Sequence, residues 1–273
     1  MRYAGILAGR QTLKQPRMAI VEDGDIYVSV YGENLVYKQR ACDNAIVWQM
    51  HVPTPRGLTF DETHGYVACF GDPNGTIVQF TKASGLVTWT APCPRPRGIV
   101  YHNRLLYCTE VKTGKVAVLH ASNGTRETTV GRLSEPRGIA IHRRTGAIYV
   151  AESNANRVIK MSSRGKVIAH HAANRPNDVA CAQERVFVSE WYTCRILSFD
   201  LHLKKAGCVD LYHLAGHLSM LTVTPDDMHV LVGDDSKQCV HIIKLSDALS
   251  NRISSGACAE AEKDHADILL PAS

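Results

Sequence analysis

The chain has 273 residues, of which 45% are apolar and 21% are charged, and this balance excludes an extensively disordered chain. Its 31 Lys and Arg residues exceed its 26 Asp and Glu residues by a net charge of +5, which permits RNA binding without implying it, because no clustered basic run accompanies the excess. No stretch approaches the roughly 18 apolar residues of a membrane span, so no contact with a membrane is expected.

The nine cysteines are scattered singly, their number is odd, and none forms a CxxC pair. That pattern argues against a disulfide framework and against a zinc knuckle. Most of the cysteines stand inside apolar runs, such as Cys69 in GYVACF and Cys108 in LLYCTE, where a reduced cysteine behaves as a small hydrophobe. The cysteine pattern therefore predicts a reducing, cytoplasmic location.

A strand-opening motif recurs six times along the chain. The copies are QPRMAI at Pro16, TPRGLTF at Pro55, RPRGIVY at Pro96, EPRGIAI at Pro136, RPNDVAC at Pro176 and a degenerate HLSMLTV at Leu218. They are spaced by 39 to 42 residues, and a fixed period in this range is the signature of a repeat architecture.

Each copy reads as four short strands. The opener is followed by a second run such as GYVACF or AIYVAE, a third such as TIVQFT or RVIKMS, and a looser fourth such as LVTWTA. These runs are rich in Val, Ile and Tyr and are bounded by Gly, Asn, Asp and Thr, which is typical of strands and turns. The repeats therefore predict an all-β fold, a six-bladed β-propeller with four antiparallel strands in each blade.

The two ends of the chain carry separate predictions. The segment 3–9, YAGILAG, is similar to the fourth strand that the sixth repeat lacks, and we expect it to pair outside the sixth blade and close the ring. The propeller domain then covers residues 1–246. Residues 247–273 are predicted to be a C-terminal tail that starts with a short helix, SDALSNRI.

The segment EPRGIAIHRRTGAIYVAESNANRVIKMSSRGKV (135–167) resembles an NHL repeat, with its P-x-G-I-A opener, I-Y-V-A-acid centre and N-x-R third strand. The likeness extends over residues 3–246. It implies a six-bladed propeller, in agreement with the number of openers. NHL propellers act as protein scaffolds in some cases and as single-stranded RNA readers in others, so the resemblance implies binding without fixing the ligand.

The start of each first strand and the end of each second strand should share one face of the propeller, because the strands are antiparallel. The residues after the opener prolines surround the axis on that face: Arg17, Arg56, Arg97, Arg137, Asn177 and Ser219. The second strands are expected to end at Val30, Phe70, Glu110, Glu152, Glu190 and Asp234. We expect ion pairs between Arg97 and Glu110 and between Arg137 and Glu152, with a positive charge over blades 1 and 2 and a negative charge over blades 5 and 6.

A non-catalytic binding or scaffold propeller that uses this face is the leading hypothesis. The expected binding residues are Arg17, Arg56, Arg97, Arg137, Asn177, Glu190, Trp191 and Tyr192. Trp191 and Tyr192 are placed in an exposed loop, which suits a partner contact or base stacking. We favour a protein partner over single-stranded RNA because the net charge is low, and we expect no cofactor. RNA would place its phosphates on the arginines and a base on one of the two aromatic rings.

An enzyme is the alternative. The segment RPNDVA (175–180) is similar to a segment of gluconolactonase-type propellers whose asparagine binds a divalent cation, and Asn177 is the matching residue. A metal-dependent lactonase-like or esterase-like hydrolase would hold a cation such as Ca²⁺ with Asn177, Glu190 and Asp234. The arginines around the axis oppose a hard cation that needs several oxygen ligands, so this reading ranks second.

Overall fold

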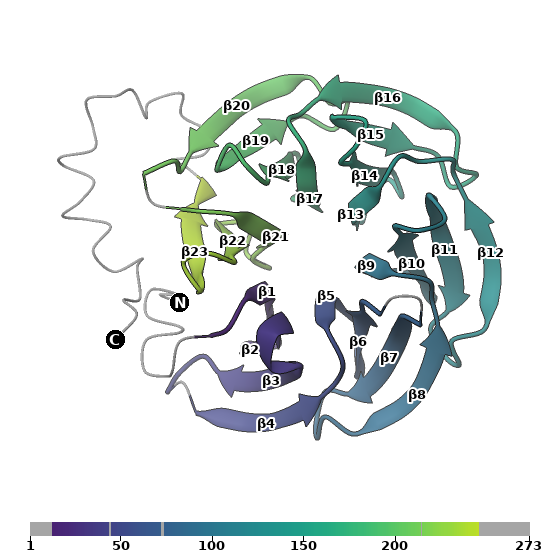
Figure 1. The fold of residues 1–273 in the computed structure, drawn as a ribbon, viewed down its shortest axis with the longest axis vertical. Helices are drawn as coiled ribbons and strands as arrows, with labels where there is room; N and C mark the ends of the chain where they lie inside the picture. The colour runs from purple at the N-terminus through teal and green to yellow at the C-terminus, as the bar shows by residue number, and fades with distance from the viewer. Residues whose placement is uncertain (1–12, 44, 72–73, 214, 246–273) are drawn as a thin grey trace.

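Six antiparallel sheets follow one another around a central axis in the computed structural model, which describes residues 13–43, 45–71, 74–213 and 215–245 (Figure 1). The first strand of each sheet lies nearest the axis, and the later strands lie progressively farther out. The prediction of a six-bladed β-propeller built from four-stranded antiparallel blades is confirmed.

The first three blades run in chain order. Blade 1 consists of β1 (Pro16–Glu22), β2 (Asp25–Val30), β3 (Leu35–Arg40) and β4 (Ile46–His51), with a short 3₁₀ turn η1 (Tyr31–Glu33) after β2. Blade 2 consists of β5 (Pro55–Phe60), β6 (His64–Cys69), β7 (Thr76–Thr81) and β8 (Val87–Pro92). Blade 3 consists of β9 (Pro96–His102), β10 (Leu105–Glu110), β11 (Lys115–His120) and β12 (Arg126–Val130).

The last three blades complete the ring. Blade 4 consists of β13 (Pro136–Ile141), β14 (Ile148–Glu152), β15 (Arg157–Met161) and β16 (Val167–Ala172). Blade 5 consists of β17 (Pro176–Cys181), β18 (Val186–Glu190), β19 (Arg195–Phe199) and β20 (Lys205–Asp210). Blade 6 consists, within the described residues, of β21 (Leu218–Val223), β22 (His229–Asp234) and β23 (Cys239–Lys244).

Two predictions about the ends fall outside the described residues. These are the closing strand at 3–9, which would supply a fourth strand to blade 6, and the tail at 247–273 with its short helix. In the part of the chain that the structure describes, no helix is long and apolar enough to cross a membrane.

Glycines at the third opener position let the inner strands approach one another closely. A Cβ atom at Gly57 would lie 2.7 Å from the carbonyl oxygen of Arg97, and one at Gly98 would lie 2.7 Å from that of Arg137. Real Cβ atoms do not come so near a backbone oxygen, so the P-R-G openers are needed where neighbouring blades meet at the axis.

Hydroxyl side chains near the ends of the second strands join blades 1, 3 and 5 to the blade that follows each of them. Ser29 Oγ donates a hydrogen bond of 2.6 Å to the carbonyl oxygen of Arg56, and Ser189 Oγ donates one of 3.1 Å to that of Ser219. Both acceptors belong to residues that face the axis. The blade contacts therefore fix the backbone from which the axial side chains project.

The second strand of blade 2 ends one residue earlier than the sequence predicts. Cys69 is the residue that pairs with Pro55, just as Val30 pairs with Pro16 in blade 1. Phe70 is therefore the residue after the strand end, and it is equivalent to Tyr31 in blade 1 and not to Val30. The prediction was wrong because two apolar residues in succession give no signal of which one closes the strand.

Candidate functional site

Two concentric sets of residues form the entrance to the axis on the opener side, which we call the axial mouth. The opener ring consists of the residues after the first residue of each inner strand: Arg17, Arg56, Arg97, Arg137, Asn177 and Ser219. The rim ring consists of the residues after each second-strand end: Tyr31, Phe70, Val111, Ser153, Trp191 and Asp235. Each rim N–H donates to the carbonyl oxygen of the residue before the opener, over 3.0 to 3.4 Å, so the two rings are held in register.

Four guanidinium groups converge in the axial mouth, and two of them have a carboxylate. Arg17 forms an ion pair with Asp235 of the rim ring. Arg137 donates through Nε and Nη2 to Glu135 Oε1, over 2.9 and 2.6 Å. Because both pairs are largely shielded from water, they hold these two guanidinium groups in place.

The other two guanidinium groups are buried without an ion pair to a carboxylate among the described residues. Arg97 is 6% exposed and donates through Nη2 to the amide oxygen of Asn177, over 2.5 Å. Arg56 is 8% exposed, and its Cζ lies 4.3 Å from the ring centroid of Phe70 and 4.9 Å from that of Tyr31. Aromatic faces attract a cation, but they do not neutralise its charge.

Burial and mutual repulsion act on these arginines together. Burial lowers the pKa of Arg17 to about 10, although Tyr31 opposes the change. Burial, and after it the neighbouring charge of Arg17, lowers the pKa of Arg56 to about 9. Burial lowers the pKa of Arg97 well below its usual value, with contributions from Arg56, Arg137 and Arg17. A guanidinium keeps its proton in proteins, so deprotonation does not relieve the unfavourable free energy of burying these charges close to one another.

One carboxyl group lies next to this cluster without forming an ion pair. Asp178 is 2% exposed and accepts the backbone N–H of Leu221 over 2.8 Å. Burial raises the pKa of Asp178 to about 7, even though hydrogen bonds to its carboxylate and the charge of Arg97 act in the opposite direction. At neutral pH it therefore compensates the arginines only in part.

Trp191 covers guanidinium groups instead of projecting into solvent. Its ring centroid lies 5.4 Å from Cζ of Arg97 and 4.9 Å from Cζ of Arg137, and its side chain is half-buried. The exposed position predicted for Trp191 was wrong for that reason. Tyr192 is 59% exposed, as expected, and stands beside His217 at the outer edge of the mouth.

The acids at the second-strand ends do not face the opener arginines, and the predicted pairs Arg97–Glu110 and Arg137–Glu152 were wrong. In the β13–β14 register Pro136 stands opposite Glu152. Adjacent side chains on a strand point to opposite faces, so Arg137 is directed away from Glu152. The buried Glu152 accepts Arg157 Nε over 2.5 Å from the third strand and Ser134 N–H over 2.9 Å from the loop before the opener.

The same structural role recurs in blades 3, 5 and 6. Glu110 pairs with Arg126, Glu190 pairs with Arg195, and Asp234 pairs with His241, at distances of 2.7, 2.8 and 3.0 Å. These acids join the second strand to the outer part of their own blade. These acids therefore add no negative charge to the mouth over blades 5 and 6, where the acidic residues beside the arginines are Asp178 and Asp235.

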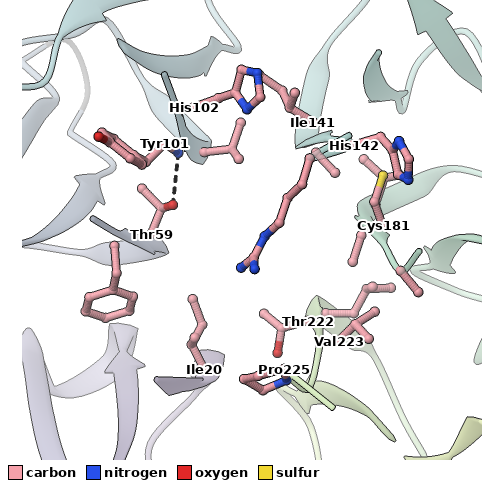
Figure 2. Close-up of a pocket in the computed structure, with 18 of the residues that line it drawn as sticks. Ile20, Thr59, Tyr101, His102, Ile141, His142, Cys181, Thr222, Val223 and Pro225 are labelled. Atoms are coloured by element: carbon pink, nitrogen blue, oxygen red, sulfur yellow. Dashed lines mark hydrogen bonds between the residues drawn. The ribbon is translucent and has the colours of Figure 1, made fainter. Parts of the chain in front are cut away.

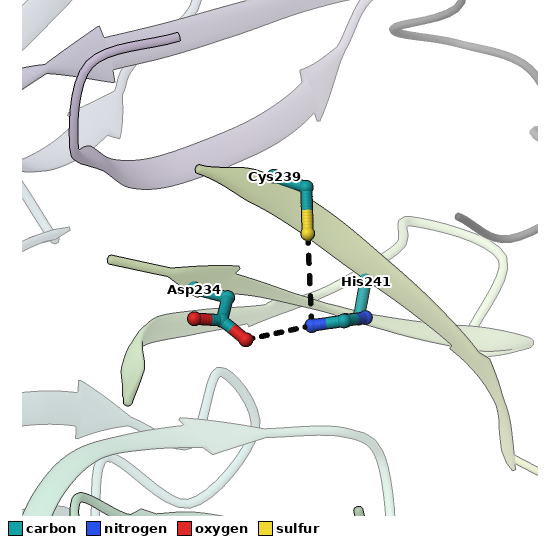
Figure 3. Close-up of side chains that lie close together, drawn as sticks. All are labelled: Asp234, Cys239 and His241. Carbon is teal, nitrogen blue, oxygen red and sulfur yellow. Dashed lines mark hydrogen bonds and ion pairs between the residues drawn. The ribbon is translucent and has the colours of Figure 1, made fainter. Parts of the chain in front are cut away.

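The blade 6 version of this contact is a buried cluster of Asp234, Cys239 and His241 (Figure 3). Their ligand-type atoms lie within 4.8 Å of one another, which raises the question of a metal. Burial alone would lower the pKa of His241, but the hydrogen bond to Asp234 raises it to about 9, so without a metal the two residues form an ion pair at neutral pH. Asp234 Oδ2 and Cys239 Sγ both approach Nε2, so no relay through both ring nitrogens forms.

This ion pair gives a testable pH dependence. The pKa of His241 is raised from 6.5 to about 9, so the pair stabilises the fold fully below pH 6.5 and is lost as the pH rises through 9. We expect the urea midpoint of the wild-type protein to fall relative to that of a His241→Gln variant between these pH values. Parallel profiles of the two proteins would show that His241 is not charged in the folded state.

The residues of the alternative hydrolase site do not converge on a cation. The amide oxygen of Asn177 accepts hydrogen bonds from Arg97 over 2.5 Å and from Arg137 over 3.2 Å. Glu190 and Asp234 are engaged by the basic residues of their own blades. A Ca²⁺ ion at Asn177 would stand directly against two guanidinium groups, so these residues do not fit a metal.

A cavity of about 510 Å³ opens at the other end of the axis, where the inner strands end (Figure 2). Its walls combine apolar side chains, such as Ile20, Ile141 and Val223, with polar ones, such as Thr59, His102 and Thr222. His142 also lines it, but both of its ring nitrogens lie 2.8 Å from protein oxygens, those of Thr145 and Gln183. A histidine held in this way has a structural role.

No protein-family model and no curated protein matches this chain. Solved structures do resemble it. A streptogramin B lyase structure superposes with a TM-score of 0.66 at 17% identity, over 84% of this chain and 78% of the lyase. A catalytically inactive histidine-to-alanine form of virginiamycin B lyase from Staphylococcus aureus, with quinupristin, gives 0.65 at 13% identity over 81% and 78%. A nidogen/laminin complex gives 0.64 at 16% identity over 77% and 85%. The likeness shows the fold alone.

Proposed function

We propose that this protein is a non-catalytic binding platform that engages a protein partner through the axial mouth. The observation that carries the proposal is the pair of buried guanidinium groups, Arg56 and Arg97, that lack a carboxylate partner among the described residues. Isolated buried charge is costly, and a site that retains it gains free energy when an anionic group enters.

Exposed aromatic side chains on the same side support a protein partner. Tyr192 is 59% exposed and Tyr212 is 69% exposed, and both lie in loops that lead toward the opener side. Exposed tyrosines on the same face as a cluster of charged side chains are typical of protein interfaces.

The depth of the arginines favours a protein side chain over an RNA backbone. Their guanidinium groups are recessed and covered by the rings of Tyr31, Phe70 and Trp191, which are therefore not free to stack bases. One compact anionic group at the end of a side chain can contact recessed guanidinium groups, whereas a run of consecutive phosphates requires an open groove. The resemblance of 135–167 to an NHL repeat and the free state of all eight described cysteines support a scaffold in a reducing, cytoplasmic compartment.

The test is selection from a randomised, displayed peptide library. Peptides with an acidic residue beside aromatic ones are expected to be enriched on the wild-type protein. Their affinity is expected to fall about tenfold or more in Arg56→Gln and Tyr192→Ala variants, and to stay unchanged in Arg144→Gln, which removes an exposed arginine at the other end of the axis. A randomised single-stranded RNA pool that binds at near-physiological salt, with no peptides selected, would replace the proposal with RNA recognition.

A further inference from the structure

Several buried donors of the axial mouth have no hydrogen-bond partner among the residues that the structure describes. They include the buried Nε atoms of Arg17, Arg56 and Arg97 and the buried hydroxyl groups of Ser153 and Ser219. All five residues belong to the opener ring or the rim ring. The rim ring also holds one orphaned acceptor, Asp235 Oδ1. Buried donors are almost always paired, and one acceptor cannot serve five donors, so an acceptor is missing from the mouth.

The charge of the missing acceptor follows from the ion pairs in the mouth. Asp235 and Glu135 neutralise Arg17 and Arg137, which leaves Arg56 and Arg97 as two buried charges without an ion-paired carboxylate among the described residues. A carboxylate carries one negative charge, whereas a phosphate monoester carries about −1.5 to −2 at pH 7. Asp178 beside Arg97 offsets this excess only in part at neutral pH. A dianion therefore matches the remaining charge better than an aspartate or glutamate side chain does.

The geometry of the donors leads to the same choice. They project from blades 1, 2, 3, 4 and 6 around the axis, and not from one side of a cleft. A planar carboxylate offers two oxygens in one plane, whereas a phosphoryl group offers three oxygens in a tetrahedral arrangement. Guanidinium forks bind such a group with two parallel hydrogen bonds each.

We propose that the axial mouth is a phosphoryl-binding site in which Arg56 and Arg97 bind a phosphate monoester dianion, with Ser219 and Ser153 as additional donors. This inference rests on the proposed function, because it names the group that the protein partner inserts into the mouth: a phosphorylated side chain. A free phosphate ester presents the same chemistry, and the test separates the two sources.

The probes are inorganic phosphate, phenyl phosphate and a randomised peptide pool with a fixed phosphoserine, each measured by calorimetry and by the thermal midpoint. All three are expected to bind the wild-type protein, and the phosphopeptides to bind more tightly than phosphate. Affinity is expected to drop about tenfold to a hundredfold in Arg56→Gln and Arg97→Gln, because each loses a charged, bidentate contact. Arg144→Gln serves as the control and is expected to bind like the wild-type protein. Arg56→Lys keeps the charge without the fork and is expected to retain only part of the affinity.

The outcomes separate the two proposals. Phosphate and phenyl phosphate binding without any gain from a peptide would uphold the phosphoryl site and overturn the protein platform. Peptides that bind equally well with unmodified serine, together with no response to phosphate, would overturn the phosphoryl site and uphold the platform. If acetate binds with the same affinity as phosphate at equal ionic strength, the assignment of a dianion is overturned. A phosphate response that survives in both Arg56→Gln and Arg97→Gln would place the ion elsewhere and overturn it as well.

Discussion

Replacing Asp234 with alanine is expected to lower the free energy of unfolding by about 3–5 kcal/mol. The carboxylate accepts the N–H groups of Gly216, Ser236 and Lys237 and forms the ion pair with His241. Its removal leaves a buried imidazole and several loop N–H groups without their acceptor. The hydrogen bonds also hold the pKa of Asp234 far below its usual range, despite its burial, which reports the same stabilisation.

Chemical denaturation measures this loss. The matched control is Glu184→Ala, which removes an ion pair of 2.8 Å with Arg144 that is exposed on both sides and is expected to cost less than about 1 kcal/mol. A loss for Asp234→Ala no greater than that of the control would show that the cluster in blade 6 does not hold the loop and the third strand together.

Replacing Arg56 with methionine is expected to raise the free energy of unfolding of the unliganded protein by about 1–3 kcal/mol. The substitution removes a buried charge and relieves the repulsion that Arg56 exerts on Arg97. Methionine retains an apolar contact with the rings of Tyr31 and Phe70. A residue whose removal stabilises the fold is retained for binding, so the gain is expected to be accompanied by loss of the response to phosphate.

The measurement is denaturation of both proteins with and without phosphate. The wild-type protein is expected to gain stability from the ion and the variant is not, so their stability difference narrows as phosphate is added. Arg144→Met is expected to stay within about 0.5 kcal/mol of the wild-type protein, because Arg144 is exposed. A fall in stability for Arg56→Met would mean that the contacts of the guanidinium with Tyr31 and Phe70 outweigh the cost of burying its charge.

The fold could be predicted from the sequence because one physical unit is repeated. The spacing of the opener prolines sets the number of blades, and the alternation of apolar residues marks the strands. Register was predictable where a charged residue closes the second strand, as Glu110, Glu152 and Glu190 do. It failed at Cys69 and Phe70, where an apolar pair leaves the end of the strand unmarked.

The opener ring was predictable and the partners of its residues were not. Its members follow directly from the repeat, since each stands one position after the first residue of the opener, which is a proline in blades 1–5 and Leu218 in blade 6. Which residues form ion pairs depends on the face of the strand that each side chain occupies. Glu152 lies on the face that brings it to Arg157, and not on the face of Arg137. The rim ring was missed because its chemistry changes from blade to blade, from Tyr31 to Asp235, so no motif marks it in the sequence. An alignment of the repeats that placed Phe70 after the strand end would have revealed the rim ring.

The opener ring is not symmetric, and this gives the mouth an orientation. Blades 1–4 contribute arginines, whereas blades 5 and 6 contribute Asn177 and Ser219. An anion seated among the arginines would therefore lie on the side of blades 1–4. Tyr192, the exposed aromatic residue of blade 5, belongs to the part of the mouth that has no opener arginine. This asymmetry predicts that a segment bound through its anionic group runs across the mouth in one direction only.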